Sequence, residues 1–267
     1  MKSSRSLLLA LALSGVITVT AACGDKKDDG AAAPATASAT SAAPSSTADA
    51  RTELANAFNK LNGTTMAYTT ETATGAVATT KLNGSIDPSK QASSGKMTIS
   101  AQGRNIDAEM IVVGTDVYLK VALPLPGVDP KKWMHVDGTK TSLSKLGLGN
   151  PDDPANVKGI SDAIVTAERT GSGSYKGTVD LTKRNVPSTS AALLQQMGDA
   201  AKSVPFEATI NSDGFLTSLT MNVPAAGQVP ATTAKSTFTD FGKPVTIAKP
   251  ADAETQAAPA ALLAQFS

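Results

Sequence analysis

The chain has 267 residues, and its 24 lysines and arginines nearly balance its 23 aspartates and glutamates. This balance gives no net field that would attract nucleic acid, and aromatic residues, at 4% of the chain, offer few rings for base stacking. The sequence has one histidine, His135, and one cysteine, Cys23, which excludes an intrachain disulfide and a Cys/His metal cluster. We therefore expect no nucleic-acid partner, no metal and no cofactor.

The amino-terminal segment has the pattern of an export signal. Lys2 and Arg5 provide positive charge, and residues 7–22 are apolar, small or hydroxyl-bearing. This run is shorter than the roughly 20 apolar residues that a transmembrane helix needs. Residues 1–22 are therefore predicted to be a signal peptide.

The apolar run ends in Thr20-Ala21-Ala22-Cys23, and charged residues follow within two positions. Small residues before a cysteine resemble the lipobox that lipoprotein signal peptidase recognises. The resemblance implies that the Cys23 thiol carries a diacylglycerol, that cleavage precedes Cys23, and that the new amino terminus is acylated. Thr20 stands where the family prefers an aliphatic residue, so two alternatives stay open: ordinary cleavage after Ala22, which leaves a free thiol, and an uncleaved anchor helix. We expect a lipid anchor in the cell membrane, with the protein on its extracytoplasmic face.

The segment after the cysteine is predicted to be a linker. Residues 23–49 are mostly Ala, Ser, Thr and Pro, which cannot bury enough apolar surface to offset the entropy lost on ordering. A disordered linker would hold the folded domain away from the bilayer. The folded domain is expected to span residues 50–250, and residues 251–267 are expected to be a flexible tail.

The first half of the domain opens with a helix and continues with strands. Asp49 is a candidate helix cap, and Leu54, Ala57, Phe58 and Leu61 form one apolar stripe that Asn62-Gly63 ends. Apolar and polar residues then alternate with the period of half-buried antiparallel strands. The expected strands are 96–102, 106–113, 117–121 and 133–136.

The second half repeats the pattern. A helical stretch is expected within 141–164, and a second helix over 188–201 presents Leu193, Leu194 and Met197 as its apolar stripe. Asp213-Gly214 is a strong signal for a tight turn between strands. The expected strands are 164–170, 175–182, 206–211, 215–223, 234–241 and 244–248.

These elements predict a mainly antiparallel β fold with a few helices (α+β). About ten strands in one sheet must curl or close, and the few short helices are too small to cover the whole apolar face. An incompletely filled apolar cavity is therefore one interpretation, and a plain solid core is the other. The candidate cavity residues are Met97, Ile99, Met110, Val112, Leu119, Leu219 and Met221.

Several stretches resemble the actinobacterial LppX/LprAFG-type lipoproteins. The stretches that carry this likeness are Asp107–Lys120, Trp133–Asp137, Tyr175–Leu181, Phe206–Leu216 and Phe238–Ile247. These lipoproteins are similar in fold to the LolA/LolB carriers, in which helices cover the apolar cavity of a curved half-barrel. The resemblance implies binding or transfer of lipids or lipidated molecules at the cell envelope. The Pro-rich segment 122–132 and the scarcity of aromatic residues depart from the family, so the ligand does not carry over.

Catalysis has little support in the sequence. His135 is the one general base of the usual kind, and Asp137 would share its face of a strand, but no Gly-x-Ser-x-Gly motif is present. We expect no enzyme, no catalytic residue, and a structural role for His135. We expect the protein to be a monomer. The lipid-binding hypothesis has one alternative, an envelope scaffold or surface lipoprotein with a solid core that binds a protein partner.

Overall fold

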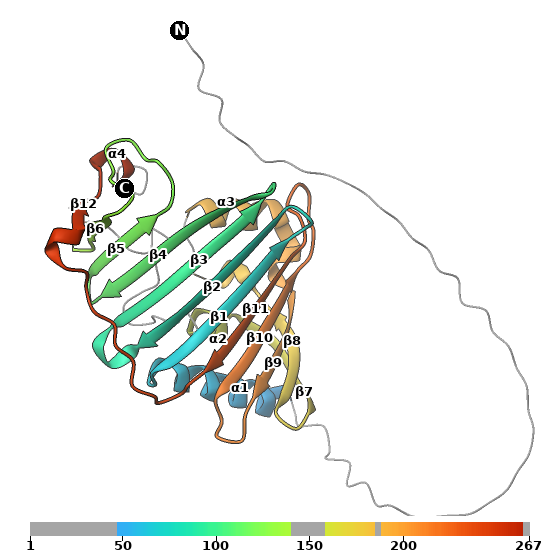
Figure 1. Ribbon diagram of the computed structural model, residues 1–267. Helices are drawn as coiled ribbons and strands as arrows, with labels where there is room; N and C mark the ends of the chain where they lie inside the picture. Colours follow the sequence, from blue (N-terminus) through green and yellow to red (C-terminus); the bar gives the residue numbers. More distant parts are fainter. Residues whose placement is uncertain (1–46, 140–157, 185–187, 264–267) are drawn as a thin grey trace, which may run out of the picture.

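The computed structural model of the chain describes residues 47–139, 158–184 and 188–263 (Figure 1). The predicted signal peptide, Cys23 and most of the predicted linker lie outside these ranges and stay predictions. Most of the helical stretch expected within 141–164 also lies outside them. The first described helix begins at Thr47, so the linker ends before the predicted boundary at residue 49.

Across the described residues, twelve strands form a single sheet in the order β12-β6-β5-β4-β3-β2-β1-β11-β10-β9-β8-β7. Neighbouring strands are antiparallel, except that β12 runs parallel to β6. The sheet is open, with β12 and β7 at its edges, and the prediction of mainly antiparallel β structure with few helices is confirmed. The strands are β1 (Met66–Thr74), β2 (Ala78–Asp87), β3 (Ala92–Ala101), β4 (Arg104–Val113), β5 (Asp116–Val121), β6 (Trp133–Asp137), β7 (Ile164–Gly171), β8 (Ser174–Val179), β9 (Val204–Ile210), β10 (Leu216–Val223), β11 (Thr232–Thr239) and β12 (Thr255–Ala257).

The sheet consists of two runs of sequential strands that meet in its middle. Strands β1 to β6 follow one another toward one edge, and β7 to β11 follow one another from the other edge. The two runs are joined where β1 pairs with β11, with Thr70 opposite Ser236 and their hydroxyl oxygens 2.9 Å apart. The centre of the sheet therefore depends on contacts between residues far apart in the chain.

Helix α1 (Thr47–Asn62) packs against β7 and β10, and we call the face of the sheet that it covers the inner face. Leu54, Phe58 and Leu61 are at most 1% exposed, as their helical spacing predicts. A polar tie joins the helix to the sheet, because the Glu53 carboxylate accepts hydrogen bonds from Arg169 and, at 2.6 Å, from the Tyr175 hydroxyl. Asp49, expected to cap the helix, lies inside its first turn instead.

The part of the chain that the structure describes has three further α-helices, all short: α2 (Lys158–Ala163), α3 (Ser188–Met197) and α4 (Ala260–Leu263). In Figure 1, α1, α2 and α3 all lie behind the sheet. Met197 is buried, but Leu193, predicted to share its stripe, is 49% exposed, because helix α3 presents Leu194 and Met197 to the core instead. The predicted covering of an apolar cavity by helices stays a prediction.

The described residues form two separate hydrophobic clusters. The first cluster joins α1 to the inner face of β7–β11 and to the first residues of β1. Its largest members are Leu54, Phe58, Leu61, Met66, Ile164, Phe206, Leu216, Leu219 and Phe238. The second cluster lies at the other end of the sheet, over β5, β6 and the carboxyl-terminal segment, and consists of Val117, Met134, Val136 and Ala258.

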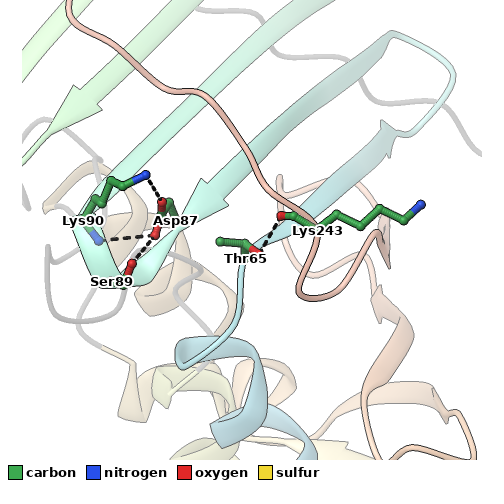
Figure 2. A network of polar contacts seen from close by, with 5 residues as sticks. All are labelled: Thr65, Asp87, Ser89, Lys90 and Lys243. Carbon is green, nitrogen blue, oxygen red and sulfur yellow. Dashed lines mark hydrogen bonds and ion pairs between the residues drawn. The ribbon is translucent and has the colours of Figure 1, made fainter.

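A buried carboxylate fixes the connection between β2 and β3. Asp87 is 3% exposed and accepts hydrogen bonds from the Ser89 hydroxyl at 2.6 Å and from the backbone N–H of Lys90 at 3.3 Å. The Lys90 Nζ lies 3.0 Å from its other oxygen (Figure 2). These hydrogen bonds, the one from Ser89 first, hold the pKa of Asp87 below its usual value.

Nearby, the Thr65 hydroxyl donates to the Lys243 carbonyl at 2.8 Å (Figure 2).

The structure also differs from the sequence expectations in four further segments. Strands β1 and β2 were not expected, and residues 244–248 form no strand. Leu181, expected on a strand, lies in a short 3-10 helix. Residues 255–263, expected within a flexible tail, form β12 and α4, and Ala258 and Leu263 pack in the second cluster.

Candidate functional site

The registers of the strands place every candidate cavity residue on the inner face. Met97 pairs with Ala108, Met110 with Leu119, Val112 with Val117, Leu219 with Ala208 and Met221 with Phe206. Paired residues of an antiparallel ladder project to the same side, and residues two apart in a strand share that side. Phe206 and Leu219 contact the first cluster beneath α1, so this side is the one that the helix covers.

The candidate residues fall into three environments. Leu219 is 3% exposed in the first cluster and is core, so it is not available to a ligand. Met221 packs at the margin of the same cluster. Met110, Val112 and Leu119 pack at the margin of the second cluster. Met97 and Ile99 are half-buried and belong to neither cluster.

The middle of the inner face is therefore apolar but only partly covered. Leu82 pairs with Met97, and Ile99 pairs with Ile106, across the adjoining strands β2, β3 and β4. All four are half-buried and lie between the two clusters. We call these four residues the inner-face band, and it is the candidate site for an apolar ligand.

Tyr68 borders the inner-face band and was not predicted as a site residue. It lies in β1, directly opposite Gly84, which in turn is opposite Gly95 of β3. The tyrosine ring fills the space of both missing side chains: a Cβ atom on Gly84 would lie 2.7 Å from the Tyr68 hydroxyl, and one on Gly95 would lie 3.0 Å from it. A glycine inside a strand often marks such a close approach, so the two mid-strand glycines were the available signal.

The outer face carries a different hollow of about 420 Å³ over β2, β3 and β4. Its rim is polar, and Lys96 Nζ lies 3.7 Å from a Glu109 oxygen within it. Trp133 contributes the aromatic wall, and the Lys120 ammonium lies 5.7 Å from the centre of a Trp133 ring. Met110 is the one candidate cavity residue among those that line this hollow, so the hollow is not the cavity that the sequence predicts.

His135 also lies on the outer face, and its partner differs from the one considered in the sequence. Its Nε2 atom lies 2.7 Å from Asp116 Oδ1, and its ring stacks on Tyr118 with centroids 4.9 Å apart. Asp116 and Tyr118 belong to β5 and His135 to the neighbouring β6, so the pair and the stack tie two adjacent strands together. This arrangement agrees with a structural histidine.

The described ranges hold neither a membrane-spanning helix nor a cluster of metal ligands. None of the helices there has the length and apolarity to cross a bilayer. Within the same residues, no three histidine, cysteine, aspartate or glutamate side chains gather in a group that could hold a metal ion.

Comparison with known proteins yields a similarity of fold alone. No family model and no curated protein matches the sequence. Among solved structures, the chain is similar to a LolA superfamily protein from Nitrosomonas europaea. The two share 13% identity with a TM-score of 0.29, over 76% of this chain and 96% of the other.

Proposed function

We propose that this protein is a membrane-anchored lipoprotein that binds or transfers lipids or lipidated molecules at the cell envelope. The observation that carries the proposal is the inner-face band, a half-buried apolar surface between two clusters of core. Apolar surface left in contact with water gains free energy when an acyl chain covers it, about 0.8 kcal/mol for each methylene group buried. Met97, an unbranched side chain, can adapt to chains of different shape.

The anchor part of the proposal rests on the sequence. The short apolar run, the small residues before Cys23 and the charged residues after it favour a lipidated amino terminus. A linker rich in Ala, Ser, Thr and Pro would let the domain reach away from the bilayer while staying tethered. A tethered lipid-binding face would exchange acyl molecules with that membrane or with partners near it.

The test compares two charges on neighbouring positions of β3. Ile99→Asp places a carboxylate on the inner-face band, whereas Ser100→Asp places one on the exposed outer face. A dansyl-labelled fatty acid is titrated into each variant and into the unaltered chain, and binding is read from the dansyl emission. Covering an ionised carboxylate with an acyl chain is costly, so Ile99→Asp is expected to weaken binding at least tenfold, and Ser100→Asp to leave it unchanged.

The outcomes separate the two functions that the sequence left open. Equal binding by the two variants would show that the fatty acid does not use the inner-face band. No binding by the unaltered chain would leave the scaffold hypothesis, in which the domain is a solid module that contacts a protein partner. Far-UV circular dichroism of each variant serves as the control for folding.

We further propose that the protein is not an enzyme. His135, the one histidine of the sequence, is engaged by Asp116 and Tyr118 on the outer face, away from the inner-face band. The proposed function needs binding and release alone, and no chemical step is assigned to any residue.

A further inference from the structure

We propose that the Tyr68 hydroxyl donates a hydrogen bond to the carbonyl oxygen of an ester- or amide-linked acyl chain that lies on the inner-face band. This inference rests on the proposed function, because it assigns the polar group that the same site would recognise. It makes the ligand an acyl compound with its carbonyl at one end of the band and its hydrocarbon chain along the rest.

The Tyr68 side chain reaches from β1 to the edge of the inner-face band. Its ring lies across β2, over Gly84, and its hydroxyl reaches Gly95 of β3. A Cβ atom on Gly95 would be 3.0 Å from that hydroxyl and 3.1 Å from Leu82 Cδ1, so the hydroxyl sits beside the first residue of the inner-face band. The ring packs at the margin of the first cluster. Tyr68 therefore brings a polar atom to the border between covered core and open apolar surface.

The Tyr68 hydroxyl is able to donate a hydrogen bond to a ligand. Within the described ranges, no group accepts from or donates to the Tyr68 hydroxyl. Burial raises the pKa of Tyr68 above its usual value, which keeps the proton on the oxygen and leaves it able to donate. A tyrosine hydroxyl in an apolar setting usually finds a partner, so a ligand acceptor would complete it.

A second hydroxyl lies on the same side of the sheet. Ser93 is 9% exposed and stands two residues before Gly95 on β3, between Ile86 and Val112. Asp87 and Ser93 are the buried polar residues of the described chain, and Asp87 has its partners in Ser89 and Lys90. No hydrogen bond of the Ser93 hydroxyl occurs among the described residues, so within them this hydroxyl, like that of Tyr68, is free to bind a ligand.

A directional contact is what an acyl-binding surface needs in addition to apolar area. Burial of a hydrocarbon chain is non-directional, so it does not fix how far the chain slides along the band. A hydrogen bond to the carbonyl sets that position, because its geometry is restricted. It also distinguishes acyl compounds from hydrocarbons and ethers of the same length.

The experiment uses two lipids that differ in one carbonyl group. Palmitoyl lysophosphatidylcholine has an ester, and hexadecyl lysophosphatidylcholine has an ether at the same place. Each displaces the dansyl-labelled fatty acid from the whole chain, from Tyr68→Phe and from Tyr118→Phe. Tyr68→Phe keeps the ring over the two glycines and removes only the hydroxyl, whereas Tyr118 lies on the outer face and provides the matched control.

The expected result is a preference for the ester that depends on Tyr68. The unaltered chain and Tyr118→Phe bind the ester more tightly, and Tyr68→Phe loses about two- to twelvefold in ester affinity, the equivalent of one hydrogen bond. Its ether affinity stays the same. An ester preference that survives in Tyr68→Phe, or an equal loss for both lipids, would overturn this inference and leave the proposed function in place. Failure of both lipids to bind the unaltered chain would overturn both.

Discussion

Leu54→Ala and Met97→Ala are expected to differ sharply in their effect on stability, because one residue is core and the other belongs to the inner-face band. Leu54 is 0% exposed in the first cluster, and truncating a fully buried leucine costs about 2–5 kcal/mol, the transfer term plus the cavity that remains. Met97 is half-buried and packs in neither cluster. Full burial of a methionine contributes about 1.5–3 kcal/mol, so the loss at a half-covered position should be about 1 kcal/mol.

Urea unfolding of the whole chain measures both changes, followed by far-UV circular dichroism and by the emission of Trp133, the one tryptophan of the sequence. A shift of the midpoint at constant slope reports stability. Fatty acid added in excess should stabilise the unaltered chain through binding to the folded state, and should stabilise Met97→Ala less. The reasoning is refuted if Met97→Ala costs as much as Leu54→Ala, because the middle of the inner face would then be packed core.

Three further changes test other features. Cys23→Ser should release the protein from the membrane fraction, and mass spectrometry of the native chain should show a diacylglycerol-sized addition at Cys23; an unmodified thiol would contradict the anchor. Asp87→Asn should cost about 1–2 kcal/mol at neutral pH. Because the pKa of Asp87 is lowered in the folded state, its contribution to stability is complete above about pH 4 and is lost as the pH falls through the folded pKa. Asp87→Asn should therefore lose less stability in acid than the unaltered chain. Equal acid dependence of the two proteins would contradict this role of Asp87. Gly84→Ala should destabilise strongly, since its Cβ would meet a backbone oxygen at 2.0 Å, whereas Gly171→Ala, with its nearest contact at 3.9 Å, should be tolerated; equal melting temperatures would refute the close packing around Tyr68.

Periodicity predicted the elements whose apolar residues follow a single rule. The stripe of α1 and the alternation in β3, β4, β5 and β9 are visible in the sequence, and the inner face of these strands was assigned from them. Strands β1 and β2 were missed because their inner positions carry Thr70, Thr72 and Thr80 in place of large apolar residues. Strand β12 was missed because a three-residue parallel pairing leaves no period to detect.

The candidate site was predicted in part for the same reason. Met97 and Ile99 follow from alternation, and pairing alone reveals that Leu82 and Ile106 complete the inner-face band. Leu219 was predicted to line the cavity but is core, because the sequence pattern of an inward residue does not indicate whether a helix covers it. Tyr68 could not be found from its own strand, because its role depends on two glycines of neighbouring strands that only the register brings beneath it.

The meeting of β1 with β11 has a consequence for how the chain reaches its native state. Thr69 and Thr237 are contact partners separated by 168 residues. The edge of β1 therefore stays unpaired during synthesis until nearly the whole polypeptide has been made. An unpaired edge is a template for pairing with other molecules, most dangerously when it is hydrophobic. The many threonines of β1, which kept this strand from being predicted, make its unpaired edge less hydrophobic and so less prone to aggregate before β11 pairs with it. Replacing its inner threonines with valines should favour aggregation during refolding.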